Sequence, residues 1–215
     1  GWNWKKGVTP GFDIVTYTGN GSARTISHGL GAVPHFMIVK ARTTAGTDQG
    51  WAVYHRNLTS AAYGLLLGSL SGEASVPTWW NSTAPTSSVF SVGTNAIVNT
   101  NNDTYLSYLW TEVPGFSKIG TYTGNGSTDG PFVWCGFRPK YLILKAATLL
   151  YSWQVSDSIR TPYNVIYGVL DPGGSGIEAT ITYAIYNHDF LSNGFKIRSA
   201  DNTCNASTYR YIFAA

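Results

Sequence analysis

Charged residues are scarce in this chain of 215 residues: Asp, Glu, Lys and Arg make up only 12% of it, against about 25% in an average soluble domain. The 14 basic and 11 acidic residues leave a formal net charge of +3. So small a charge cannot neutralise many phosphates, and we expect no nucleic-acid partner. No apolar run reaches the roughly 18 residues of a membrane-spanning helix, so we expect no membrane insertion.

Cysteine is nearly absent, and so are the signals for long helices. Cys135 and Cys204 are the only two cysteines, too few for a disulfide framework. We expect both to be free thiols in a core if the protein is made in a reducing cytoplasm, and their pairing stays open. No amphipathic pattern extends beyond one or two helical turns. The sequence starts without Met, so we expect it to be part of a longer protein.

Glycine and aromatic residues are plentiful. The chain has 24 Gly, 14 Tyr, nine Phe and eight Trp, which is typical of short strands joined by tight turns in an all-β protein. Phe12–Tyr17 alternates apolar and polar residues, as a half-buried strand does, and Phe36–Val39 is continuously apolar, as a central strand is. Ile177–Tyr186 is a further β-prone run. These patterns predict a fold made of β-strands.

A repeat divides the chain into two modules. The sequence Tyr-Thr-Gly-Asn-Gly-Ser at residues 17–22 recurs unchanged at residues 122–127. Residues 34–41 match residues 139–146 at the same spacing, and Trp51 matches Trp153. We therefore predict a lead segment 1–11 and two tandem, homologous antiparallel β-sandwich modules of jelly-roll type, at 12–114 and 115–215. One merged barrel is the alternative.

The most conspicuous candidate site is a loop rich in Pro, Ser and Thr that contains two adjacent tryptophans. Exposed Trp rings are unfavourable in water, but they can stack on the apolar faces of sugars while neighbouring amides bond to hydroxyls. The predicted glycan-binding residues are Trp79, Trp80 and Asn81, with weaker support for Trp51, Tyr54 and His55. Two alternatives stay open: one or both Trp rings cap the edge of the sandwich, or they bury a subunit contact.

No pattern in the sequence indicates catalysis, a metal or a cofactor. The 11 carboxylates are scattered, and the histidines lack metal-ligand spacing. His188-Asp189 is interpreted as a loop feature rather than half of a catalytic triad. The repeated Gly-Asn-Gly segment lacks the Lys and the following helix of a phosphate-binding loop, so we interpret it as a tight turn. We expect no catalytic residue, no metal ligand and no cofactor.

Several segments together resemble a known family of proteins. They are residues 2–6, 29–40, 51–55, 80–90, 189–198 and the closing run 209–214. In this combination the chain resembles tandem β-modules at the C-terminal end of large structural proteins of tailed bacteriophages. The resemblance covers nearly the whole chain and implies a virion component. That family has no established catalytic or ligand-binding residues, so none is transferred to this sequence.

These observations lead to three functional hypotheses. The first is a non-enzymatic tail-fibre or adsorption module that recognises a glycan or receptor on the host surface. The second is a capsid-decorating or tail-assembly protein, and the third is a depolymerase of surface polysaccharide, which requires two facing carboxylates. By analogy with tail fibres we expect a homo-oligomer, a trimer, that contacts other virion proteins. We expect it in the virion, after assembly in the host cytoplasm.

Overall fold

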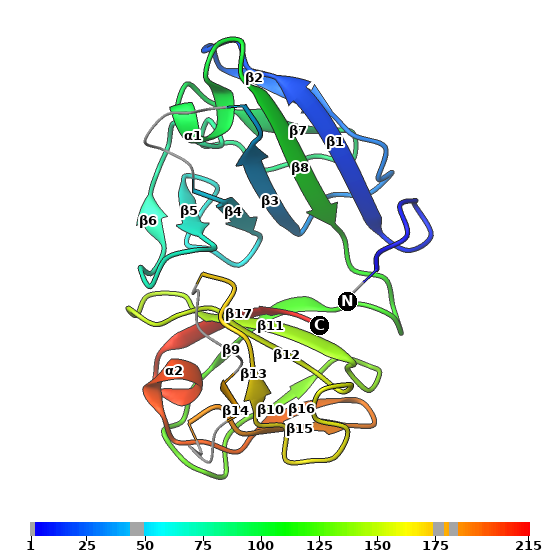
Figure 1. Ribbon diagram of the computed structural model, residues 1–215, viewed down its shortest axis with the longest axis vertical. Coiled ribbons are helices and arrows are strands. Elements are labelled where there is room, and N and C mark those ends of the chain that lie inside the picture. Colours follow the sequence, from blue (N-terminus) through cyan, green and yellow to red (C-terminus); the bar gives the residue numbers. More distant parts are fainter. Residues whose placement is uncertain (1–2, 44–49, 174–178, 181–184) are drawn as a thin grey trace. The chain divides into compact units, whose positions relative to one another are not determined.

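The chain folds into two units built almost entirely of β-strands (Figure 1). The structure is a computed structural model, and it describes residues 3–43, 50–173, 179–180 and 185–215. Unit 1 comprises Gly1–Leu67 and Glu73–Val113, and unit 2 comprises Gly68–Gly72 and Pro114–Ala215. The strand pairs between described residues are all antiparallel, as the sequence predicted for an all-β sandwich fold.

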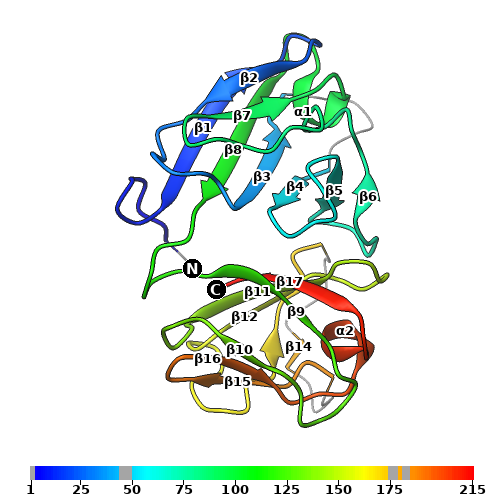
Figure 2. The same ribbon diagram turned by 180° about the vertical axis from the view of Figure 1, so that it is seen from behind.

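Unit 1 consists of one large sheet, a two-stranded layer and one helical turn. The six-stranded sheet has the order β1-β8-β3-β4-β5-β6 and the second layer is β2-β7. The strands are β1 (Phe12–Thr18), β2 (Arg24–Ser27), β3 (Phe36–Ala41), β4 (Ala52–His55), β5 (Tyr63–Leu66), β6 (Ala74–Ser75), β7 (Val89–Val92) and β8 (Thr104–Trp110). Figures 1 and 2 show the β2-β7 layer on one side of β1, β8 and β3. The turn α1 (Ala96–Asn99) begins after Asn95, whose side chain accepts a hydrogen bond from Ile97 N.

The core of unit 1 lies between these two layers. Burial alternates along β8, where Tyr105 and Leu109 are fully buried and face Phe90 and Val92 of the second layer in one apolar cluster. Such alternation is what a strand with one face on a core produces, because successive side chains point to opposite faces. The aromatic and branched residues of the sequence therefore fill the space between two sheets.

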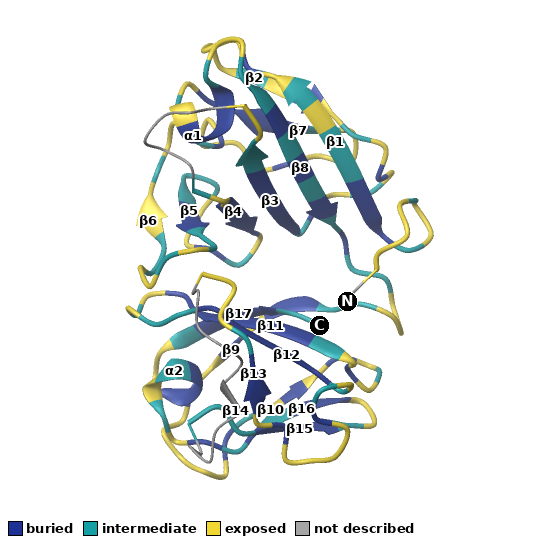
Figure 3. Ribbon diagram, in the orientation of Figure 1, coloured by how far each residue is buried: buried dark blue, intermediate teal, exposed yellow. Residues whose placement is uncertain are grey.

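Unit 2 repeats this arrangement with a larger second layer. A four-stranded sheet has the order β12-β11-β17-β9, and a three-stranded sheet has the order β10-β16-β15. The strands are β9 (Ile119–Thr123), β10 (Phe132–Trp134), β11 (Tyr141–Ala146), β12 (Gln154–Asp157), β13 (Gly168–Val169), β14 (Ala179–Thr180), β15 (His188–Leu191), β16 (Gly194–Ile197) and β17 (Arg210–Ala214). The turn α2 (Asn202–Asn205) corresponds to α1. Figure 3 shows that β11 and β12 are buried along most of their length.

Most sequence predictions agree with the observed strands. The predicted strands at Phe12–Tyr17 and Phe36–Val39 are confirmed as β1 and β3. Of the predicted run Ile177–Tyr186, residues 179–180 form β14, while residues 177–178 and 181–184 lie outside the described residues. The two helices among the described residues are each a single turn, as the lack of amphipathic patterns indicated. No helix in the described ranges is long and apolar enough to cross a membrane.

Candidate functional site

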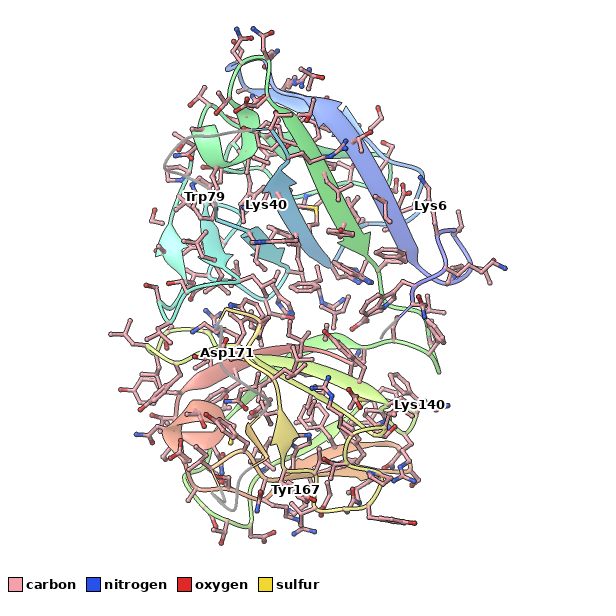
Figure 4. All side chains as sticks on the ribbon, viewed as in Figure 1. Lys6, Lys40, Trp79, Lys140, Tyr167 and Asp171 are labelled. Atoms are coloured by element: carbon pink, nitrogen blue, oxygen red, sulfur yellow. The ribbon has the colours of Figure 1, made fainter. Side chains whose placement is uncertain are left out.

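Trp80 belongs to the core of unit 1. Its side chain is 1% exposed, and its ring meets the ring of Tyr54 edge-on at 6.1 Å between centroids. The half-buried Trp79 meets Trp80 at 6.3 Å and packs beside Gly64 of β5; Figure 4 labels it on the side of unit 1 that carries β5 and β6. The structure thus favours the alternative in which a tryptophan closes the sandwich. A sugar cannot reach Trp80 in this arrangement.

The other predicted glycan-binding residues are not gathered on one surface. Tyr54 and His55 are buried, and His55 Nδ1 accepts a hydrogen bond from Asn57 N. Trp51 is 38% exposed and lies below Lys40, with 5.7 Å from Nζ to the ring centroid. Asn81 is exposed in a turn with φ of +52°. Of the six residues, only Trp51 and Asn81 are exposed, so glycan binding by this set stays a prediction.

The repeated Gly-Asn-Gly turn of unit 1 is held by a buried asparagine. Asn99, at the end of α1, is fully buried. Its Nδ2 donates to Asn20 Oδ1 at 3.3 Å and to the carbonyls of Ser22 and Gly93 at 2.7 Å each. Its Oδ1 accepts from Asn20 N at 3.0 Å. Every donor and acceptor of the amide is therefore used inside the unit.

Unit 2 repeats these contacts residue for residue. Asn205 Nδ2 donates to Asn125 Oδ1 at 2.9 Å and to the carbonyls of Ser127 and Ser199 at 2.7 Å each, and its Oδ1 accepts from Asn125 N at 2.9 Å. A Cβ on Gly124 would lie 2.2 Å from the carbonyl oxygen of Ala206, so only glycine fits there. The repeated motif is a structural turn, and the backbone N–H groups of its glycines donate to carbonyls within their own unit.

Unit 2 contains a buried serine–histidine pair that the sequence did not reveal. His188 Nε2 lies 3.0 Å from Ser156 Oγ, and Nδ1 lies 2.9 Å from the carbonyl of Tyr186. Burial lowers the pKa of His188 to about 4, so the ring is neutral at pH 7. Ser156 is 3% and His188 4% exposed, which keeps both away from solvent and from any substrate. The interpretation of His188-Asp189 as a loop was wrong, because both residues lie in β15.

Five carboxylates of the described residues are held in ion pairs. Asp13 pairs with Lys6 at 2.8 Å, and hydrogen bonds from Lys6 and the backbone outweigh burial, so that its pKa is lowered. The other pairs are Glu112–Arg56, Asp157–Arg160, Asp129–Lys196 and Asp189–Arg198. Acids held ionised in this way are poor proton donors. Within the described ranges, no group of three His, Cys, Asp or Glu could hold a metal ion, and both cysteines are buried, free thiols.

The exposed surface of β10 carries two aromatic side chains. Phe132 is 44% and Trp134 61% exposed, while Val133 between them is 8% exposed and packs in the core of unit 2. Residues two apart in a strand share a face, so both rings lie on the outer side of the sheet. We call Phe132 and Trp134 the β10 aromatic pair. The matching strand of unit 1 is β2, which carries Thr25 and Ser27 at these positions around the buried Ile26.

Ion-paired side chains border the β10 aromatic pair. Phe132 stands opposite Lys196 of β16, which in turn stands opposite Asp189 of β15, so the three share the outer face. Lys196 Nζ bonds to Asp129 at 2.8 Å, and Arg198 Nε bonds to Asp189 at 2.5 Å. We call Asp129, Asp189, Lys196 and Arg198 the ion-paired rim. Trp134 stands opposite Gly194, which adds no side chain to this face.

The fold defines the class of protein: two homologous antiparallel β-units in one chain, each with its own core. A family model described as "Domain of unknown function (DUF7483)" matches residues 2–215, and the chain belongs to this family. No curated protein and no solved structure matches the chain.

Proposed function

We propose that this protein is a non-enzymatic virion module that attaches to a host surface, with a glycan as its ligand. The observation that carries this proposal is the β10 aromatic pair. Large apolar side chains on a solvent-facing strand are unfavourable unless a partner covers them. Trp and Phe rings are also the groups that stack on the apolar face of a sugar ring. The placement in a virion rests on the resemblance to bacteriophage structural proteins.

The chemistry of the acidic and nucleophilic groups supports a binding role. Asp13, Asp129 and Asp157 all have lowered pKa values, so none is suited to act as the general acid of a glycosidase. The hydroxyl of Ser156 and the ring of His188 lie inside unit 2. Recognition of a surface by stacking and hydrogen bonds requires no reacting group.

Competition for host cells tests this proposal. Host cells are incubated with the purified chain, phage is added, and the unadsorbed plaque-forming particles are counted. The chain should slow adsorption, and the variant Phe132→Thr/Trp134→Ser should not. The matched control, Thr25→Ala/Ser27→Ala on β2, should compete like the parent chain. Equal competition by the β10 variant would show that the pair does not recognise the host.

A second candidate function, decoration or assembly of the particle, is favoured by other exposed apolar residues of unit 2. Leu150 is 73%, Ile159 85% and Tyr163 81% exposed. Such residues could pack against neighbouring subunits. Labelling with antibodies on intact particles separates the two roles: label at the tail tip supports attachment, and label over the shell supports decoration.

A further inference from the structure

We propose that the β10 aromatic pair and the ion-paired rim form a binding site for an uncharged glycan, with neighbouring sugar rings stacked along the strand. This inference rests on the proposed function and specifies the ligand class of the same site. It depends on three features: the spacing of the rings, the cancelled charge of the rim and the lack of a side chain at Gly194.

The two rings are spaced for a chain rather than for a single small molecule. Phe132 and Trp134 are two residues apart on one strand, which places their Cα atoms roughly 7 Å from one another. Both side chains point away from the core. A linear saccharide lying along β10 can therefore place one ring on each aromatic side chain.

The surroundings of the rings leave room for such a ligand. A Cβ on Gly194 would lie 3.1 Å from the ring of Phe132, so this ring leans over glycine backbone. A Cβ on Gly136 would lie 3.1 Å from Trp134 Cζ2, so the indole is supported on that side by another glycine. Lys118 Nζ lies 5.9 Å from the centroid of the Trp134 ring, and the indole remains 61% exposed.

The rim favours hydroxyl groups over charged groups. Its two carboxylates, Asp129 and Asp189, are matched by Lys196 and Arg198, so its formal charges cancel. The side chain of Asp129 is 82% exposed, and its bonds to Lys196 lower its pKa, which keeps it ionised. Ionised oxygens accept hydrogen bonds from sugar hydroxyls, and a rim whose charges cancel offers no net attraction to the carboxylate or sulfate of an acidic sugar.

Unit 1 provides the matched comparison. Its strand β2 has the same backbone role but carries Thr25 and Ser27, and Thr25 stands opposite Ser91 instead of a lysine. The change Phe132→Thr/Trp134→Ser therefore gives β10 the outward residues that β2 already carries. A loss of binding in this variant reports the missing rings, because the fold accommodates these residues.

Affinity electrophoresis with polysaccharides tests the inference. The full chain is run in native gels that contain one neutral polysaccharide (dextran, laminarin, mannan or galactan) or one acidic polysaccharide (alginate or polygalacturonate). We expect retardation by at least one neutral polymer. The apparent affinity should fall about tenfold or more in Phe132→Thr/Trp134→Ser, since stacked aromatic rings supply much of such binding. The variant Thr25→Ala/Ser27→Ala should be retarded like the parent chain.

Each other outcome overturns the inference in a recognisable way. Retardation by the acidic polymers alone would show that the ligand is charged. The same conclusion would follow if the variant Asp129→Asn bound alginate more tightly than it bound any neutral polymer. Retardation that is unchanged in the β10 variant would place the glycan elsewhere, and no retardation by any neutral polymer would exclude this ligand class. If the β10 variant nevertheless loses competition for host cells, attachment through β10 stands and only the glycan assignment fails.

Discussion

In unit 1, strand β2 turns Thr25 and Ser27 toward solvent, whereas the matching strand β10 of unit 2 turns Phe132 and Trp134 outward. The residue between them is apolar and buried in both strands. Because side chains alternate across a sheet, the core constrains only every second position. A duplicated unit can therefore acquire a binding surface on one copy without repacking its core.

The lysine that recurs in β3 and β11 also has different surroundings in the two units. Lys40 lies above the ring of Trp51 in unit 1. Its counterpart Lys145 is fully buried in unit 2, where Nζ donates to the carbonyls of Leu70, Leu149 and Tyr151. Burial lowers the pKa of Lys145 to about 8. The same residue type at matching positions can thus lie over an exposed ring in one unit and be buried in the other.

The largest expected effect is on a core residue that only unit 1 has. Trp80→Ala should lower the free energy of unfolding of unit 1 by about 3–5 kcal/mol, because it empties a fully buried site. Denaturant unfolding should show this loss in the transition of unit 1 and leave that of unit 2 in place. Trp79→Ala serves as the control with a smaller loss, since Trp79 is half-buried. Equal losses from both would contradict the core position of Trp80.

The next largest effect is expected at the buried asparagines, whose substitution should destabilise the two units equally. Asn99→Asp and Asn205→Asp each remove the Nδ2 donor and leave three oxygens facing a carboxylate. Each variant should destabilise its own unit by about 3 kcal/mol or more. Thermal and denaturant unfolding measure the loss, and Asn101→Asp, at an exposed position, is the control. A large difference between the two variants would mean that the turns are not energetically equivalent.

A pH titration should then distinguish the units. His188 is the only histidine of unit 2, and its pKa is about 4 in the folded state against about 6.5 in an unfolded chain. Between these values the unfolded state binds more protons, so unit 2 should lose about 3 kcal/mol of stability as the pH falls from 6.5 to 4.

Unfolding curves collected across this pH range measure the loss. In His188→Gln, the dependence between pH 6.5 and 4 should disappear from unit 2. Further loss below that range belongs to carboxylates such as Asp157, whose lowered pKa places their protonation at lower pH. An unchanged pH dependence in the variant would assign it to other groups.

The smallest expected effect is on the stability of the β10 variant. Phe132→Thr/Trp134→Ser should change the free energy of unfolding of unit 2 by less than about 0.5 kcal/mol, because both side chains face solvent. Denaturant unfolding and the far-UV circular dichroism spectrum check this. A loss above about 2 kcal/mol would mean that the rings support the fold and would reassign them from binding to structure.

The fold could be predicted from the sequence because it is repeated. Tyr17 and Tyr122 match in the repeat, and both hydroxyls donate to carbonyls of the following helical turn, those of Val98 and Cys204. Glycine, asparagine and aromatic residues that recur at one spacing are required by the fold. The two short helices have no sequence period of their own, since one turn is too short to show one.

The position of the exposed aromatic residues could not be predicted. Trp80 has no counterpart in unit 2 and is nevertheless buried, because it fills the core next to Tyr54. Phe132-Val133-Trp134 is continuously apolar, so periodicity does not show which side faces the core. The orientation of β10 follows only from its pairing with β16, which places Val133 opposite the buried Phe195.

The buried asparagines also affect how this protein ages chemically. Asn20-Gly21 and Asn125-Gly126 are dipeptides of the kind that deamidates readily. In this reaction the backbone nitrogen of the glycine attacks the side-chain carbonyl of the asparagine, and a succinimide forms with loss of ammonia. Here Gly21 N donates to the carbonyl of Asn99 at 2.9 Å and Gly126 N to that of Asn205 at 2.8 Å. Each attacking nitrogen is therefore engaged, and we expect peptide mapping of aged protein to find both sites unmodified until their unit unfolds.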